Sequence, residues 1–199
     1  MTFLQELASW RTPEAKATKP VPVIGSKAHS SERLLVPDVD GRPIIVTFLR
    51  HCGCPFAEKT FIALRTIAAE TPSIRFVAVS HSDQASTERW LEAVGGAGDS
   101  VQVIVDAKRN LFAQWGLGVS SLWHVLNPAG LWEVYQLGRD EGIWNRPTES
   151  GSRWQTAGSF AVDAEGIVRW GGACSRASEI PDFHEAVEAL KRAEHAANL

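Results

Sequence analysis

Hydrophobic and polar positions follow two periods along the chain and predict an alternating order of strands and helices. Residues 44–49 form a nearly continuous apolar run, which is typical of a central strand covered on both faces. After Pro55 the apolar residues take helical spacing, until Thr71-Pro72 ends the pattern. Further strands and helices are expected at residues 74–80, 84–94, 101–105 and 108–115. This order predicts a mainly parallel sheet with helices on its faces.

The rhythm changes over residues 116–156, which are rich in tryptophan and turn residues. We interpret this segment as an insertion with little regular structure, of the kind that forms a lid, a binding loop or an interface. Alternation resumes with a hairpin at 158–170, and a last helix is expected at 181–194. Before the first strand, residues 1–34 read as a short helix at 3–10 followed by an extended arm. One α/β domain is therefore expected at 35–194, with the insertion inside it.

Composition restricts the classes of function. The 199 residues are 44% hydrophobic and 22% charged, as in an ordinary globular protein, and the net charge of −3 argues against nucleic-acid or anionic-membrane partners. No apolar run reaches the length of about 18 residues that a membrane span requires. The amino-terminal residues lack the basic region of a signal peptide, so we expect a cytoplasmic protein. Its three cysteines should then be reduced unless they are catalytic.

Cys54 lies at the junction between the first buried strand and the first helix. Pro55 suits the first helical position, which would place the Cys54 sulfur near unpaired helix N–H groups. These groups, together with Arg50 and His51 if they lie close, favour the nucleophilic thiolate. His51 is also a candidate acid or base, or a structural hydrogen-bonding residue. Ligands of open α/β sheets bind at the carboxyl ends of strands, where this junction lies.

The run Phe-Leu-Arg-His-Cys-Gly-Cys-Pro-Phe-Ala at 48–57 resembles the active-site stretch of peroxiredoxin-like proteins of the alkyl hydroperoxide reductase/thiol-specific antioxidant (AhpC/TSA) group, in the thioredoxin-like superfamily. The segments 77–83, 105–116 and 160–168 resemble later stretches of the same group, so the resemblance covers about residues 35–190. It implies a thioredoxin-like fold with a mostly parallel central sheet, a C-terminal antiparallel hairpin and helices on both faces. It also implies a thiol-dependent oxidoreductase that uses no cofactor, with Cys54 as nucleophile, a peroxide or small-molecule substrate, and thioredoxin or glutathione as reductant.

The chain departs from that group at several positions. Ala57 stands where many relatives have the second cysteine of Cys-x-x-Cys, so ordinary dithiol exchange is not available at this site. His51 and Thr47 stand where true peroxiredoxins have threonine and proline, and Ala157 stands where they have an arginine. Efficient peroxide reduction therefore does not follow from the resemblance alone.

An oxidised Cys54 would need a thiol to reduce it. Cys52 is the first candidate, through a strained Cys-x-Cys disulfide, although strand alternation equally allows its side chain to point into the core. Cys174 follows the last hairpin and is either a surface thiol or a second resolving residue. The remaining possibility is a one-cysteine mechanism with an external thiol. Cys-x-Cys is a poor zinc signature, so we expect no metal.

Two further hypotheses come from the aromatic segment. Arg153, Trp154 and Trp123 are candidate substrate-binding residues, because aromatic faces and guanidinium groups suit an organic pocket. One alternative function is therefore non-redox chemistry on an organic metabolite in a pocket lined by the segment's tryptophans. The other is a non-catalytic interaction module, for example a homodimer.

Overall fold

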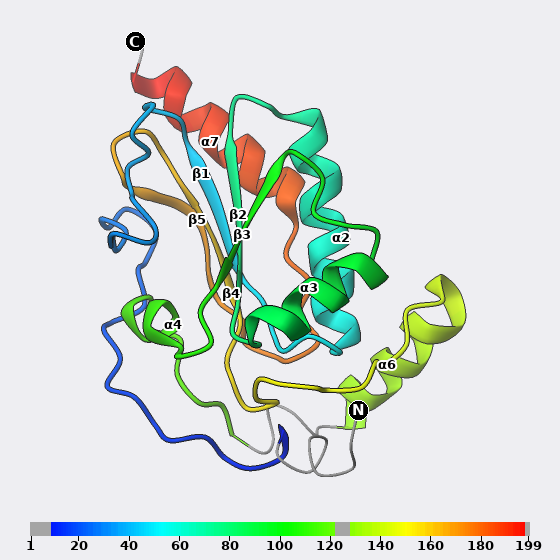
Figure 1. Cartoon of the computed structure of the whole chain (residues 1–199). Coiled ribbons are helices and arrows are strands. Elements are labelled where there is room, and N and C mark those ends of the chain that lie inside the picture. The colour runs from blue at the N-terminus through cyan, green and yellow to red at the C-terminus, as the bar shows by residue number, and fades with distance from the viewer. Residues whose placement is uncertain (1–8, 122–127, 198–199) are drawn as a thin grey trace.

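A computed structural model, which describes residues 9–121 and 128–197, contains a five-stranded sheet in the order β3-β2-β1-β4-β5 (Figure 1). Its strands are β1 (Ile44–Phe48), β2 (Arg75–Ser80), β3 (Val101–Val105), β4 (Gly158–Val162) and β5 (Val168–Ala173). The first three are parallel, whereas β4 runs antiparallel to β1, and β5 antiparallel to β4. Strict alternation of side chains sends one set of strand residues to each face of the sheet.

Helices cover both faces of this sheet. Helices α2 (Pro55–Glu70), α3 (Gln84–Ala93) and α7 (Phe183–Ala197) contribute to one hydrophobic cluster, which includes Ile45 and Phe76 of the strands. The short helix α4 (Asn110–Gln114) and the arm around Leu34 form the cluster on the opposite face, with Phe48 and Phe160. Each central strand is therefore buried on both sides, which explains its continuous apolar run.

The structure confirms the predicted order of strands and helices and the antiparallel hairpin. It contradicts the interpretation of residues 116–156 as irregular, because helix α6 (Pro128–Glu141) lies within them. The buried residues of α6 are glycines, and Leu131, Trp132 and Tyr135 are exposed. Its apolar residues therefore do not form the inward stripe by which a helix is recognised in sequence. The expected helix at 3–10 falls almost entirely outside the described residues, as does Trp123.

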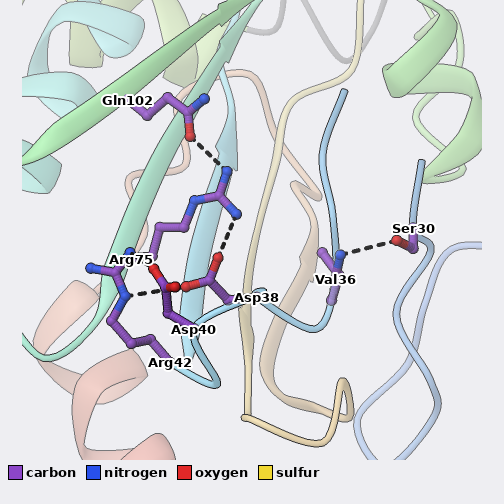
Figure 2. Close-up of polar contacts among 7 residues, drawn as sticks. All are labelled: Ser30, Val36, Asp38, Asp40, Arg42, Arg75 and Gln102. Atoms are coloured by element: carbon purple, nitrogen blue, oxygen red, sulfur yellow. Dashed lines mark hydrogen bonds and ion pairs between the residues drawn. The ribbon is translucent and has the colours of Figure 1, made fainter. Parts of the chain in front are cut away.

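The amino ends of the strands are joined by an ion-pair network (Figure 2). Arg75, the first residue of β2, binds the buried Asp38 carboxylate at 3.0 Å and the Gln102 side chain of β3 at 2.7 Å. Arg42 binds the other oxygen of Asp38 at 3.2 Å. This network lies at the end of the sheet opposite the cysteines that follow β1, so it stabilises the frame rather than forming part of the candidate site.

Candidate active site around the β1–α2 turn

Cys54 is the N-cap residue of the 16-residue helix α2, with Pro55 in the first helical turn. Its backbone is extended (φ −76°, ψ 125°), its N–H donates to the His51 carbonyl at 3.1 Å, and its carbonyl accepts from Glu58 N–H at 3.1 Å. The Cys54 side chain makes no capping hydrogen bond to the N–H groups of the first turn. The structure therefore confirms that Cys54 stands at the start of a helix, whereas stabilisation of its thiolate stays a prediction.

The Cys54 side chain is nearly buried, with 5% of the residue exposed. It belongs to a small apolar cluster with Phe56 and Ala57 of its own helix. Val134 and Leu137 of α6 pack on this cluster, as does Ile180 from the segment between β5 and α7. Helix α6 is thus a cover over the amino-terminal end of α2. Access of a substrate to this sulfur depends on that cover.

Cys52 packs in a different place. It belongs to the main core cluster on the α2–α7 face, and its Sγ lies 3.6 Å from Ser80 Oγ and 3.9 Å from Thr87 Oγ1. Burial raises the pKa of the Cys52 thiol, against the opposing hydrogen bond from Ser82 and those from Ser80 and Thr87. The Cys52 side chain therefore points into the core, which is one of the two orientations that the sequence allowed. The use of Cys52 as a resolving thiol stays a prediction.

A cavity of about 200 Å³ opens beside Cys52 and Gly53. Trp90 of α3 lines it, together with Arg146 and Pro147 from the loop after α6. The hypothesis of an organic-substrate pocket expected walls made of tryptophans from the 116–156 segment. Among the described residues, the tryptophan of this cavity comes from α3, and the loop after α6 contributes charged residues and proline, so a lining by tryptophans of the 116–156 segment stays a prediction.

Gly53 allows the two cysteines to face different clusters. Its φ of +107° is a conformation that side chains rarely adopt, and it reverses the chain between Cys52 and Cys54. A Cβ on Gly53 would stand 2.8 Å from the carbonyl oxygens of both Arg146 and Pro147. The Gly53 carbonyl also accepts a hydrogen bond from Arg146 N–H at 2.9 Å. The turn is therefore built against the loop that follows α6.

An ion pair fixes the same loop to α2. The Arg146 guanidinium donates two hydrogen bonds to the Glu58 carboxylate, at 2.7 and 3.0 Å, and Glu58 is almost fully buried. Sequence analysis missed this contact, because the two residues are 88 positions apart and no local pattern links them. It also missed Ser80 and Thr87, which look like ordinary strand and helix residues.

The two basic residues before Cys52 have different environments. Burial, and then the nearby Arg50, holds the pKa of His51 well below its ordinary value. His51 is therefore neutral at physiological pH and does not act as a cation beside Cys54; its acid–base role stays a prediction. Arg50 is 8% exposed and donates to the Arg153 carbonyl at 2.9 Å. It also lines a small cavity next to Cys174.

Arg153 and Trp154 bind the amino-terminal segment of the chain. Arg153 stacks on the Trp10 ring at 4.8 Å and donates to Ser9 Oγ at 3.0 Å. Trp154 is buried, contacts the Trp10 ring edge to face, and donates from its indole N–H to the Trp10 carbonyl at 2.9 Å. Their assignment to a substrate stays a prediction.

Neither a metal centre nor a membrane span is found in the part of the chain that the structure describes. Residues 9–121 and 128–197 contain no group of three histidine, cysteine or acidic side chains arranged to hold a metal ion. Within the same ranges, every helix is too short or too polar to cross a bilayer.

Comparison with known proteins places this fold. A family model described as "AhpC/TSA antioxidant enzyme" matches residues 63–173, more than half of the chain. The chain belongs to the AhpC/TSA family. The match begins within α2 and ends at Ala173, so it includes none of the three cysteines. No curated protein matches the chain at a significant level.

Solved structures of peroxiredoxin-like proteins share the architecture of this AhpC/TSA protein. A peroxiredoxin-like protein from Aquifex aeolicus is similar with a TM-score of 0.59 and 16% identity, over 89% of this chain and 91% of that one. A thiol peroxidase from Chromobacterium violaceum gives 0.52 and 12% identity, over 90% and 92%. A 2-Cys peroxiredoxin from Plasmodium vivax gives 0.51 and 13%, over 79% and 80%. At these identities the likeness establishes the thioredoxin-like fold, and the chemistry has to be argued from the site.

Proposed function

We propose that this protein is a thiol-dependent oxidoreductase in which Cys54 is the nucleophile. The observation that carries the proposal is the position of Cys54 as the uncapped N-cap residue of a long helix, directly after a central strand. The positive end of a helix dipole generally favours a thiolate over a thiol, and this general effect supports the proposal. Membership of an antioxidant-enzyme family supports this chemistry.

The preferred reaction is the reduction of a hydroperoxide. The Cys54 thiolate attacks one peroxide oxygen, an S–O bond forms and the O–O bond breaks. The leaving alkoxide takes up a proton and departs as an alcohol, or as water from hydrogen peroxide. Cys54 is left as a sulfenic acid, which a thiol must reduce. Thiol–disulfide exchange by the same nucleophile is the second form of this proposal, with an external thiol such as thioredoxin or glutathione as reductant.

The apolar cover over Cys54 suggests which substrates are favoured. With 5% of the residue exposed, the sulfur is reached more readily by a small hydroperoxide than by a bulky one, unless α6 moves. The same cover therefore restricts access to the sulfur.

Mass spectrometry after treatment with equimolar hydrogen peroxide and a sulfenic-acid trap tests the proposal. Trypsin should release Cys52 and Cys54 together in the peptide 51–59, and Cys174 in the peptide 170–176. We expect Cys54 to be modified faster than Cys174, in wild type and in Cys52→Ser, and the modification to disappear in Cys54→Ser. If Cys174 reacts as fast as Cys54, or if the label in 51–59 persists in Cys54→Ser, the proposal is wrong.

The cavity beside Cys52 favours one alternative, which is non-redox chemistry on a small organic molecule. This alternative predicts that turnover survives Cys54→Ser, whereas the preferred proposal predicts its loss. The homodimer hypothesis rests on exposed aromatic residues, since Trp132 and Tyr135 stack at 5.4 Å on the surface of α6. Light scattering on the purified protein tests it, and a monomer would remove its support.

A further inference from the structure

A small cavity lies between the start of α2, the end of β1 and the segment that follows β5. Its volume of about 20 Å³ is enough for one water molecule. Ala57 of α2 and Cys174 both line it, and Arg50 and Glu179 are the charged residues around it. The segment from Cys174 to α7 runs past the amino-terminal end of α2, as Figure 1 shows and as the packing of Ile180 on the Cys54 cluster confirms.

The cavity is on the Cys54 side of α2. Cys54 is the N-cap and Ala57 stands three positions later, so the two share one face of the helix, and they pack in the same cluster. Ala57 also occupies the position of the second cysteine in a Cys-x-x-Cys sequence. Because Cys174 shares a cavity with Ala57, its thiol lies next to the position that the second cysteine occupies in a Cys-x-x-Cys sequence.

A second observation at the same cavity concerns charge. Among the described residues, the Arg50 Nε has no hydrogen-bond partner, although Arg50 is more than nine-tenths buried. Its other end is held by the Arg153 carbonyl, so the guanidinium stays beside the cavity. The positive charge of Arg50 favours a thiolate at Cys174, whereas burial and Glu179 oppose it and raise the pKa of Cys174 to about 12. The Nε of Arg50 is thus a buried donor without a hydrogen-bond partner beside the cavity that Cys174 also lines.

We propose that Cys174 is the resolving thiol of this enzyme and takes the part of the cysteine missing at position 57. The proposal rests on the proposed function of Cys54. The Cys174 sulfur attacks the Cys54 sulfenic acid, an S–S bond forms, the S–O bond breaks, and water leaves with the thiol proton. An external dithiol then reduces the disulfide and is itself oxidised. Cys52, in contrast, points into the core toward Ser80 and Thr87.

Non-reducing peptide mapping of the oxidised wild-type protein is the decisive experiment. After equimolar hydrogen peroxide without reductant, we expect a linked species of peptides 51–59 and 170–176, lighter than their sum by two hydrogens. The link should persist in Cys52→Ser, which is the matched control. In Cys174→Ser it should be lost, and Cys54 should accumulate as a trappable sulfenic acid.

The outcomes separate the two proposals. If Cys54 becomes a sulfenic acid in wild type but stays unlinked, or links to Cys52 within peptide 51–59, the assignment of Cys174 is overturned while Cys54 remains the nucleophile. If Cys54 is not oxidised at all, both proposals fail. Because the wild-type map alone decides between these results, the inference does not depend on the folding of any variant.

Discussion

The ion pair between Arg146 and Glu58 offers a sharp test of how the loop after α6 is held against α2. The Glu58 side chain is 8% exposed, whereas the Arg146 side chain is 40% exposed. Replacing Arg146 with glutamine would leave a carboxylate buried without its cation. Replacing Glu58 with glutamine would leave a guanidinium that water can still solvate. The two single variants should therefore differ, although they break the same contact.

The structure sets the magnitude of that difference. Each hydrogen bond to a charged group contributes about 1.5–3 kcal/mol, and removing one partner of a fully buried pair costs about 3–5 kcal/mol. Solvent at the exposed side of Arg146 reduces these values. We expect Arg146→Gln to lower the free energy of unfolding by about 2–3 kcal/mol, and Glu58→Gln by about 1 kcal/mol. The double variant should be more stable than Arg146→Gln, because it no longer buries an unpaired charge.

Urea unfolding of the four proteins, followed by far-UV circular dichroism, measures these free energies. Arg139→Gln is the matched control, because Arg139 pairs with Asp140 at 2.6 Å on an exposed surface, where no measurable change is expected. The reasoning is refuted if Arg146→Gln costs no more than Arg139→Gln. It is also refuted if Glu58→Gln is the more destabilising of the two single variants.

Three further predictions follow from the site. A Cβ at Gly53, where φ is left-handed, would meet two carbonyl oxygens at 2.8 Å, whereas a Cβ at Gly142 would meet open space. Gly53→Ala should therefore lower the urea midpoint clearly more than Gly142→Ala. Equal effects of the two substitutions would contradict the packing argument. Burial lowers the pKa of His81 to about 4, so the unfolded chain binds a proton below pH 6.5 that the folded protein binds only near pH 4. The free energy of unfolding should therefore fall by about 3 kcal/mol as the pH drops through this window, and His81→Gln should abolish this fall. An unchanged pH profile of unfolding in that variant would exclude His81 as the cause. Glu179→Gln removes a negative charge beside Cys174, so the pH profile of disulfide formation should move to lower pH, and a profile that does not move would exclude electrostatic control by Glu179.

The sheet and its helices could be predicted because their signals are local. Each central strand is apolar on both faces, and the amphipathic helices after Pro55 and before the C-terminus pack one face on the sheet. The position of Cys54 at a helix start was equally local, since Pro55 marks the first turn. Helix α6 could not be predicted in this way, because its apolar side chains are divided between solvent and the small cluster at Cys54.

Local sequence patterns could not predict where the three cysteine side chains point. Strand alternation left Cys52 open between core and surface, and the backbone at Gly53 decided the matter by reversing the chain. The environment of Cys174 depends on Arg50, which is distant in sequence and reaches the same cavity only in the folded chain. Composition and motif spacing indicate candidate residues for thiol chemistry, but long-range packing determines which of these side chains lie close together.

The three cysteines thus occupy environments with different chemical consequences. Cys52 lies among apolar side chains and hydroxyl groups, and burial raises the pKa of its thiol by more than its hydrogen bonds lower it. The Cys52 thiol therefore stays protonated. Cys54 stands instead at the start of a long helix, which is the position where the proposed function puts the nucleophile. At Cys174 burial, and then the Glu179 carboxylate, raise the pKa of the thiol, and Arg50 opposes them. If Cys174 resolves an oxidised Cys54 as proposed, that step should be limited by deprotonation of Cys174, and substitution of Glu179 should accelerate it.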